Sequence, residues 1–168
     1  MTGPESTGKT TLARRIANSL GTECVPEASR LYAERVPREL TSADVEPIAR
    51  EHITLADAEA ERARARGGSV LVLDTDLLST VVYGRYYYDF SSVWLERTAL
   101  TRRADLYLLC DVDVPWIPDG IRDQPMAREV MFGRFRDALD ELGARTVVVR
   151  GDWDARWEIA LAALGCDG

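Results

Sequence analysis

Residues 3–10 read Gly-Pro-Glu-Ser-Thr-Gly-Lys-Thr and fit the pattern G-x-x-x-x-G-K-S/T of a phosphate-binding loop. The backbone N–H groups of such a loop converge on phosphate oxygens, and the N-terminus of the following helix adds partial positive charge. The segment Thr10–Leu20 has apolar residues at helical spacing and is followed by Gly21, which predicts the helix that the motif requires. The stretch therefore predicts that the chain binds a nucleoside triphosphate.

Two side chains of this loop suit ATP and its magnesium ion. Lys9 is the only lysine of the chain, and its ammonium is expected to reach the β- and γ-phosphates. The hydroxyl of Thr10 is expected to hold Mg²⁺. The alternative, a plain glycine-rich turn, is disfavoured by the helical pattern behind the motif. The residues expected to bind ATP are Gly3, Glu5, Ser6, Thr7, Gly8, Lys9, Thr10 and Thr11.

Length and charge limit the classes of protein to consider. The 168 residues suit one domain with a hydrophobic core, since 46% of them are apolar and 29% are charged. The 21 basic and 28 acidic residues leave a formal net charge of −7, which argues against general binding to nucleic acid or anionic membranes. No apolar run approaches the roughly 18 residues of a membrane span, so we expect no membrane helix. We expect a cytoplasmic protein whose partner is a small, nucleoside-like molecule. The sequence leaves the oligomeric state open.

The number of histidines and the spacing of the cysteines argue against several kinds of site. His52 is the only histidine, which disfavours a histidine-based metal centre and leaves a serine–histidine–aspartate triad dependent on this one residue. Cys24, Cys110 and Cys166 are widely spaced and form no CxxC pair. We therefore expect reduced thiols rather than a disulfide framework or a zinc site.

Strands and helices are predicted to alternate along a single domain. No internal repeat or low-complexity linker divides the chain, which we treat as one domain over residues 1–168. Continuous apolar runs indicate parallel strands buried on both faces, and the pattern predicts an open α/β sheet with right-handed crossovers. Ligands of such sheets bind beyond the carboxyl ends of the strands. We expect helices at Thr10–Leu20, Ala28–Val36 and from a cap at Ser42 to about Arg66, and strands at Cys24–Val25, Val70–Leu73, Leu106–Cys110 and Val147–Val149.

Acidic side chains follow two of the predicted strands. Asp74 and Asp76 come after the strand that ends at Leu73, and Glu27 comes after the strand that ends at Val25. A carboxylate at a strand tip beside a phosphate-binding loop commonly holds Mg²⁺ or its water shell, and a hydroxyl acceptor needs a group to take or orient its proton. The three carboxylates are therefore expected to surround the γ-phosphate. The alternatives are a helix cap for Asp76 and a surface position for Glu27.

A proline-containing loop follows the predicted strand Leu106–Cys110. Residues 111–125 contain three prolines, which restrict the backbone, and we expect a lid at about residues 112–128. Arg122 and Arg128 are expected to swing onto the transferring phosphate. The alternative for each arginine is a solvated or salt-bridged side chain.

An aromatic cluster lies upstream of this loop. Tyr83, Tyr86, Tyr87 and Tyr88 crowd one stretch together with Arg85. Aromatic rings stack on planar substrate groups, and Tyr83 and Tyr87 are the candidates for that contact. A helix face packed into the core explains the same pattern equally well.

Four segments form an ordered series of motifs over nearly the whole chain: GPESTGKT, VPEASRLY, LVLDTD and DVDVPWIPDGIRDQP, with Arg128 six residues beyond Arg122. This series resembles the ribosylnicotinamide kinase domain of NadR-type proteins. The resemblance implies a P-loop NTPase fold of three α/β/α layers with an open, mainly parallel sheet. It implies phosphoryl transfer from ATP to the 5′-hydroxyl of nicotinamide riboside, which gives nicotinamide mononucleotide for NAD synthesis. It also implies that Glu27 and Arg30, an E-x-x-R pair, face the substrate.

Three departures from the family pattern stand out. His52 lies in the segment IAREH, where we expect a glutamine, and an acceptor contact at this position would change the substrate. Only Met1 and Thr2 precede Gly3, so the strand ahead of the loop is expected to be truncated, and we favour a native chain that begins upstream of Met1. Fuller members of the family carry an adenylyltransferase domain ahead of the kinase, so we expect the kinase half alone.

The main expectation is a small-molecule kinase that acts on nicotinamide riboside. Its first alternative is a kinase for another nucleoside or hydroxylated metabolite. The second is a regulatory ATPase with no phosphate acceptor, and the third is a module that only binds nucleotide. The groups Glu27, Arg30, Asp74 and Asp76 favour a kinase, because hydrolysis needs a water-orienting residue and no acceptor pocket.

The roles of the carboxylates are assigned by position. Asp74 comes directly off the buried strand beside the phosphate-binding loop, so we assign it to Mg²⁺ and its water. Glu27 precedes Arg30 by three residues, so both can face the acceptor from the start of one helix, and we expect Glu27 to accept or orient the hydroxyl proton. Asp76 is expected to bind the ribose hydroxyls. The alternative exchanges the roles of Glu27 and Asp76.

Overall fold

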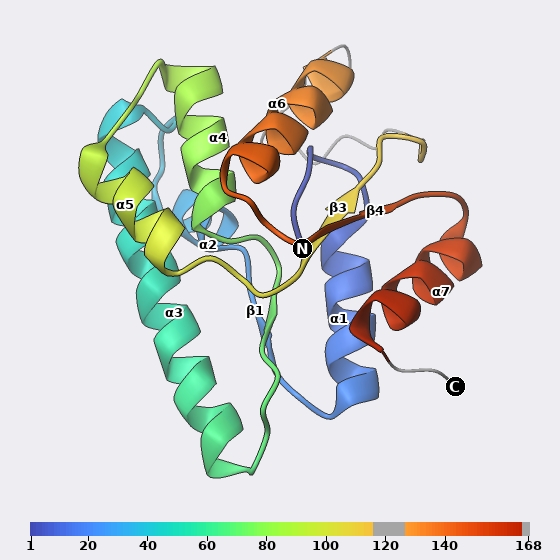
Figure 1. The fold of residues 1–168 in the computed structure, drawn as a ribbon. Helices are drawn as coiled ribbons and strands as arrows, with labels where there is room; N and C mark the ends of the chain where they lie inside the picture. The colour runs from blue at the N-terminus through green and yellow to red at the C-terminus, as the bar shows by residue number, and fades with distance from the viewer. Residues whose placement is uncertain (116–126, 166–168) are drawn as a thin grey trace. The chain divides into compact units, whose positions relative to one another are not determined.

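The computed structural model describes residues 1–115 and 127–165 (Figure 1). The chain divides into two compact units: Met1–Leu12 with Ala104–Gly168 form unit 1, and Ala13–Arg103 form unit 2. Helix α1 (Lys9–Leu20) begins in unit 1 and continues in unit 2. That the chain is a single kinase domain with a lid stays a prediction.

Unit 1 is built on two parallel strands. Strand β3 (Tyr107–Cys110) pairs with β4 (Thr146–Val149), from Tyr107 opposite Thr146 to Cys110 opposite Val149. All four residues of β3 are buried, as a continuous apolar run predicts for a strand covered on both faces. The helices of this unit are α6 (Arg128–Glu141) and α7 (Trp153–Leu164).

Thr2 extends the strand pairing of unit 1 on β3. Its N–H donates to the Leu108 carbonyl at 3.0 Å, and its carbonyl accepts from the Cys110 N–H at 3.0 Å. These bonds form an isolated parallel bridge between Thr2 and Leu109. The position ahead of the phosphate-binding loop is thus strand-like over one residue.

Apolar residues four positions apart form the buried face of α6. Met131, Phe135 and Leu139 are each at most 1% exposed, and their spacing places them on one side of the helix. Burying each side chain contributes about 1.5–3 kcal/mol of transfer free energy. This packing fixes the helix whose first residue is Arg128.

Unit 2 contains two short parallel strands. Strand β1 (Cys24–Val25) pairs with β2 (Val72–Leu73), with Val25 opposite Leu73. The Asp74 N–H donates to the Val25 carbonyl at 2.9 Å, so the pairing continues past the end of β2. Because the strands are parallel, their carboxyl ends lie at one edge. The helical elements of this unit are α2 (Ala28–Arg35), the 3₁₀ turn η1 (Ser42–Asp44), α3 (Val45–Ala65), α4 (Leu77–Tyr88) and α5 (Val93–Thr101).

Helices α3, α4 and α5 lie beside one another in unit 2 (Figure 1). They share the hydrophobic core of this unit. Ile53, Tyr88, Phe90 and Trp94 pack against that core. No helix in the described parts of the chain is long and apolar enough to cross a membrane. The buried core residues are Val45, Ala49, Leu77, Val81, Leu95 and Ala99.

Two sequence predictions in unit 2 are wrong in detail. Ser42 does not cap the long helix, because it is the first residue of η1, and Asp44 occupies the N-cap position of α3. The Asp44 carboxylate accepts from the Thr41 N–H at 2.8 Å, and this local bond sets the turn ahead of the helix. The strand predicted over Val70–Leu73 pairs only at Val72–Leu73, since Val70 is 42% exposed and lies outside the core. The other predicted helices and strands are confirmed to within one residue at each end.

Candidate functional site

The phosphate-binding loop of unit 1 requires both glycines of its motif. Gly3 has φ +124°, and a Cβ there would lie 2.8 Å from the Cys110 carbonyl oxygen. Gly8 has φ +80°, and a Cβ there would lie 2.5 Å from the ring of Trp153. Ser6 also has a positive φ, of 53°. The loop therefore combines a left-handed backbone with close packing, and only glycine satisfies both demands at the motif positions.

Lys9 lies over its own loop. Its side chain is largely buried, and its ammonium donates to the Pro4 carbonyl at 2.5 Å. The Thr7 hydroxyl donates to the same carbonyl at 2.8 Å. Thr10 is half-buried in the first turn of α1, and Thr11 beside it is exposed. The residues predicted to bind ATP thus lie around the N-terminus of one helix, where a bound anion is favoured.

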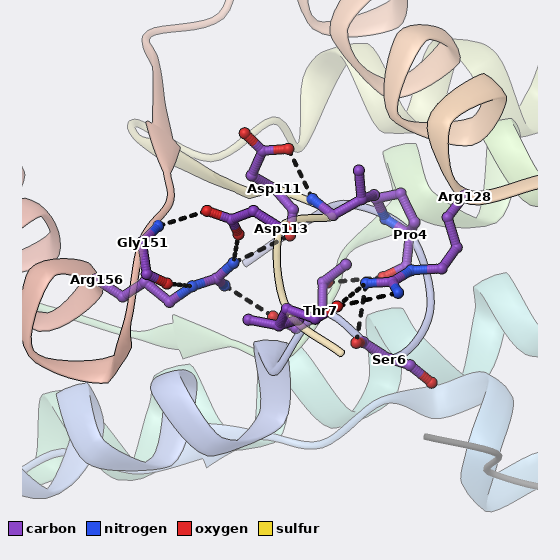
Figure 2. Close-up of polar contacts among 10 residues, drawn as sticks. Pro4, Ser6, Thr7, Asp111, Asp113, Arg128, Gly151 and Arg156 are labelled. Carbon is purple, nitrogen blue, oxygen red and sulfur yellow. Dashed lines mark hydrogen bonds and ion pairs between the residues drawn. The ribbon is translucent and has the colours of Figure 1, made fainter. Parts of the chain in front are cut away.

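Arg128, the first residue of α6, bonds to this loop although it lies far from it along the chain. Its guanidinium donates to the Val114 carbonyl at 3.1 and 3.2 Å and to the Ser6 carbonyl at 3.4 Å (Figure 2). The side chain is 7% exposed, and its Nε has no hydrogen-bond partner in the described parts of the chain. Burial lowers the pKa of Arg128, while the carboxylate of Glu5 acts in the opposite direction. A buried cation held mainly by neutral carbonyls is stabilised further by an anion.

Sequence reasoning missed Arg156 of α7 as a residue of this site. Its side chain is 1% exposed, and its guanidinium donates to the Thr7 carbonyl at 2.9 Å (Figure 2). An arginine four residues before the buried Ala160, on the apolar face of the helix, was the available signal. Arg128 and Arg156 therefore hold two consecutive carbonyls of the phosphate-binding loop.

In unit 2 the carboxyl end of β1 presents an ion pair. Glu27 occupies the N-cap position of α2, and its Oε1 accepts from the Ser29 hydroxyl at 2.7 Å. Its Oε2 lies 3.8 Å from Nε of Arg30. Glu27 and Arg30, which the sequence places on one side at the start of this helix, therefore form an ion pair. The catalytic role of Glu27 stays a prediction.

The carboxyl end of β2 carries two buried carboxylates. Asp74 and Asp76 are 3% and 6% exposed, on either side of Thr75. Thr75 has φ +81°, which is strained for a β-branched residue, and strain of this kind clusters at functional sites. The Asp76 carboxylate accepts from the Ser79 N–H at 3.3 Å and caps α4, so the helix cap considered for Asp76 is confirmed. Because β1 and β2 are parallel, Glu27 follows the neighbouring strand at the same edge.

The aromatic cluster lies on α4. Tyr83 and Tyr87 stack with ring centroids 5.9 Å apart, and Tyr86 meets Tyr87 edge to face at 4.9 Å. Tyr83 is buried, whereas Tyr86 and Tyr87 are half-buried. Their contact with a substrate ring stays a prediction.

His52 lies on α3 and is 5% exposed. Burial lowers the pKa of His52, and the nearby Asp76 carboxylate opposes that effect. The imidazole is therefore neutral near pH 7. The position at which we expect a glutamine in NadR-type kinases thus lies near one of the predicted acceptor-side carboxylates.

The predicted site residues fall into one group in each unit. Unit 1 holds the phosphate-binding loop and Arg128, and unit 2 holds the acceptor-side groups. Arg122 lies outside the described residues. Among residues 1–115 and 127–165, no cluster of three His, Cys, Asp or Glu side chains could hold a metal ion. The acceptor-side groups are Glu27, Arg30, Asp74, Asp76, Tyr83 and Tyr87.

Comparison with known proteins identifies the family of the chain. A family model described as an AAA domain matches residues 1–156. The chain belongs to the AAA domain family. This AAA domain is 28% identical over 164 residues to the trifunctional NAD biosynthesis/regulator protein NadR of Escherichia coli. The match covers 92% of this chain and 38% of that protein, so the chain spans less than half of the relative's length.

Two solved structures of NadR share the fold of this AAA domain. NadR in complex with NR gives a TM-score of 0.81 at 27% identity, over 97% of this chain and 49% of that chain. NadR in complex with NAD and AMP-PNP gives a TM-score of 0.77 at 22% identity, over 99% of this chain and 49% of that chain. The P-loop kinase fold and the resemblance to NadR-type proteins are therefore confirmed.

Proposed function

We propose that this chain is an ATP-dependent kinase that phosphorylates the 5′-hydroxyl of nicotinamide riboside to give nicotinamide mononucleotide. The observation that carries the proposal is the set of charged side chains at the carboxyl ends of β1 and β2: Glu27 paired with Arg30, and the buried Asp74 and Asp76. An ATPase that only hydrolyses its nucleotide needs no such set. The similarity to a NadR structure in complex with NR supports nicotinamide riboside as the acceptor.

On the donor side, the loop over residues 3–10 binds the phosphates through backbone N–H groups. Lys9 and Arg128 supply positive charge to the γ-phosphoryl group as it is transferred. Such pre-arranged electrostatic stabilisation is commonly the largest contribution to catalysis. Arg122 joins them from the proposed lid. The similarity to a NadR structure that contains AMP-PNP supports ATP as the donor.

Magnesium is the proposed second cofactor. Mg²⁺ prefers oxygen ligands and keeps several of its waters, so one or two protein groups are enough to hold it beside substrate phosphates. The Thr10 hydroxyl and the buried Asp74 carboxylate supply oxygen ligands of this kind. When bound, Mg²⁺ supplies charge neutralisation on the phosphates of ATP.

On the acceptor side, Glu27 takes the proton of the 5′-hydroxyl. The acceptor oxygen forms a bond to the γ-phosphorus, the bond from that phosphorus to the β–γ bridging oxygen breaks, and ADP leaves. Asp76 binds ribose hydroxyls with the carboxylate that also caps α4. Arg30 orients Glu27, and Tyr83 and Tyr87 contact the planar ring of the acceptor.

A nucleoside panel tests the proposal. The full chain is incubated with Mg-ATP and nicotinamide riboside, adenosine, uridine or no acceptor, and ADP release and the phosphorylated product are measured. We expect ADP release with nicotinamide riboside to exceed the no-acceptor control at least tenfold, with one phosphate added per acceptor. Equal release with and without acceptors would identify a regulatory ATPase and overturn the proposal.

The second candidate is a kinase for another nucleoside. His52 favours it, because the buried imidazole lies near Asp76 where NadR-type kinases are expected to carry a glutamine. In the same panel, turnover of adenosine or uridine with none of nicotinamide riboside identifies this candidate. A His52→Gln variant that then gains turnover of nicotinamide riboside would assign the difference to this residue.

A further inference from the structure

We propose that Arg156 is a positioning residue of the nucleotide site, which sets the orientation of the Thr7–Gly8 peptide in the phosphate-binding loop. The inference rests on the proposed binding of ATP by this loop. Arg156 lies outside the motif, 149 residues after Thr7, and it touches the loop backbone rather than any atom that reacts.

The Arg156 guanidinium joins several segments of unit 1 (Figure 2). Its Nη1 donates to the Thr7 carbonyl at 2.9 Å, its Nε to the Gly151 carbonyl at 2.9 Å, and its Nη2 to the Asp111 carbonyl at 3.1 Å. Nη2 also pairs with the Asp113 carboxylate. A planar guanidinium with a fixed fork of donors suits this task, whereas the single ammonium of a lysine does not.

A peptide held at its oxygen is also held at its nitrogen. In a trans peptide the C=O and the N–H point to opposite sides, so a Thr7 carbonyl fixed toward Arg156 turns the Gly8 N–H away from it. Gly8, at φ +80°, has no Cβ to restrict its backbone, so the flanking peptide needs an outside constraint. A flip of this peptide would replace an anion-binding N–H by a carbonyl oxygen that repels phosphate.

The charge of Arg156 is balanced within the same network. Burial acts to raise the pKa of Asp113, but the Gly151 N–H, which donates to its Oδ2 at 2.5 Å, and the Arg156 guanidinium bring it below the usual value. Asp113 therefore stays ionised near neutral pH and holds the guanidinium in one orientation. The Asp113–Arg156 pair is thus a rigid support behind the loop.

Trp153 supplies a spectroscopic reporter of the loop. It lies three residues before Arg156 on α7, and its ring atom Cη2 would lie 2.5 Å from a Cβ at Gly8. The two side chains of one helix therefore contact consecutive residues of the loop. A change in the Thr7–Gly8 peptide is expected to alter the fluorescence of Trp153.

The decisive experiment compares ADP binding by Arg156→Lys and by Arg145→Lys, in the full chain and by calorimetry. Arg145 is a matched control, because it donates to the Ala163 carbonyl of α7 at 3.1 Å and makes no bond to the loop. We expect Arg156→Lys to raise the ADP dissociation constant about tenfold or more, and Arg145→Lys to change it less than about twofold. KM for ATP should rise more than kcat falls, and the ADP-induced change in tryptophan fluorescence, assigned with Trp153→Phe, should shrink in Arg156→Lys only.

Equal ADP affinity of folded Arg156→Lys and wild type would overturn the inference, and so would equal losses in both arginine variants. If Arg156→Lys does not fold, Asp113→Asn decides, because its half-exposed side chain can lose its charge without opening the core. Asp113→Asn should then weaken ADP binding about threefold, and unchanged binding contradicts the proposal. A wild type that binds ADP and phosphorylates no nucleoside refutes the proposed kinase function alone, since the binding comparison needs no acceptor.

Discussion

The Lys9 ammonium donates to the Pro4 carbonyl at 2.5 Å, five residues earlier in the same loop. The bond holds the only lysine of the chain across the segment that presents its N–H groups to phosphate. Lys9 is also largely buried. No second lysine is present in the chain to take over its role.

We expect Lys9→Ala to abolish phosphoryl transfer and to leave the fold intact. The variant loses the charge that stabilises the γ-phosphoryl group during transfer, but within the described residues it loses one hydrogen bond of the folded state, to the Pro4 carbonyl. Turnover and the circular dichroism spectrum check both parts. Arg14→Ala, at an exposed position of α1, is the control and should turn over as wild type does. Retention of more than about a tenth of wild-type turnover by Lys9→Ala would refute the role of the loop in catalysis.

Arg122 and Arg128 are expected to act on turnover more than on resting nucleotide affinity. Arg128 bonds most closely to Val114, its contact to the Ser6 carbonyl is 3.4 Å long, and Arg156 still holds the loop without it. We expect Arg122→Ala and Arg128→Ala each to lower kcat about a hundredfold, because such arginines stabilise the charge of the transition state. The dissociation constant for ATP should change less than about threefold.

Steady-state kinetics together with ATP binding separate the outcomes for these two arginines. Arg134→Ala in the exposed part of α6 controls for the loss of a positive charge. A variant with normal ATP binding and normal turnover marks its arginine as an ordinary surface or packing residue. A large loss of ATP affinity in Arg128→Ala would instead show that Arg128 helps to bind the phosphates of ATP before transfer.

The carboxylate of Asp44 is expected to contribute to the stability of unit 2 in a pH-dependent way. It is 2% exposed and accepts bonds from both Nη atoms of Arg38 at 2.7 and 2.9 Å, from the Tyr32 hydroxyl and from the Thr41 N–H. Asp44→Asn keeps the shape but removes the charge, and we expect it to cost about 2 kcal/mol of unfolding free energy at pH 7. Glu39→Gln, an exposed neighbour, should cost almost nothing.

The Arg38 guanidinium lowers the pKa of Asp44 strongly, against the opposing effect of burial. A carboxyl group with a depressed folded-state pKa contributes its stability above the unfolded pKa of about 3.9 and loses it as pH falls toward the folded value. The difference in Tm between wild type and Asp44→Asn should therefore be full at pH 7, begin to shrink below about pH 5, and close as the pH falls further toward the folded-state pKa. A constant difference across that range would show that the charge of Asp44 contributes nothing.

Local sequence signals predicted much of the fold and of the donor site. The spacing of Gly3, Gly8 and Lys9 predicts the phosphate-binding loop because the residues of this motif lie next to one another in the sequence. The buried strand β3 was readable from its apolar run for the same reason. The capping contact between Thr41 and Asp44 also had a local signal, T-x-x-D, which Ser42 obscured as a competing cap.

Local sequence patterns did not predict the contacts between distant segments. Arg156 bonds to Thr7 and to Asp113, which lie 149 and 43 residues away along the chain. The spacing of Arg156 from Ala160 indicates a buried side chain, but it does not show which distant segments the guanidinium bonds. The exposure of Val70 is similar, because an apolar residue at a strand end is buried only if another segment covers it.

The three acceptor-side carboxylates have different surroundings, which assign them different roles. Glu27, Asp74 and Asp76 cannot do the same task, since like charges in one site repel one another unless a cation or substrate separates them. Asp76 already caps α4, so its replacement should affect stability as well as binding. Glu27 is held by Arg30 and Ser29 at the start of α2 and makes no cap bond, which leaves it better suited to move a proton.

We therefore expect Glu27→Gln to lower kcat about 10²–10⁴-fold, the usual cost of removing a general base, with little change in the dependence on Mg²⁺. Asp74→Asn should shift the Mg²⁺ concentration that gives half-maximal rate, and Asp76→Asn should mainly raise KM for the nucleoside. Magnesium titrations and acceptor kinetics on the three variants separate these effects, with thermal unfolding to correct for the cap lost at Asp76. If Glu27→Gln merely raises the acceptor KM while Asp76→Asn destroys kcat, the two residues exchange roles: Asp76 takes the hydroxyl proton, and Glu27 binds the ribose.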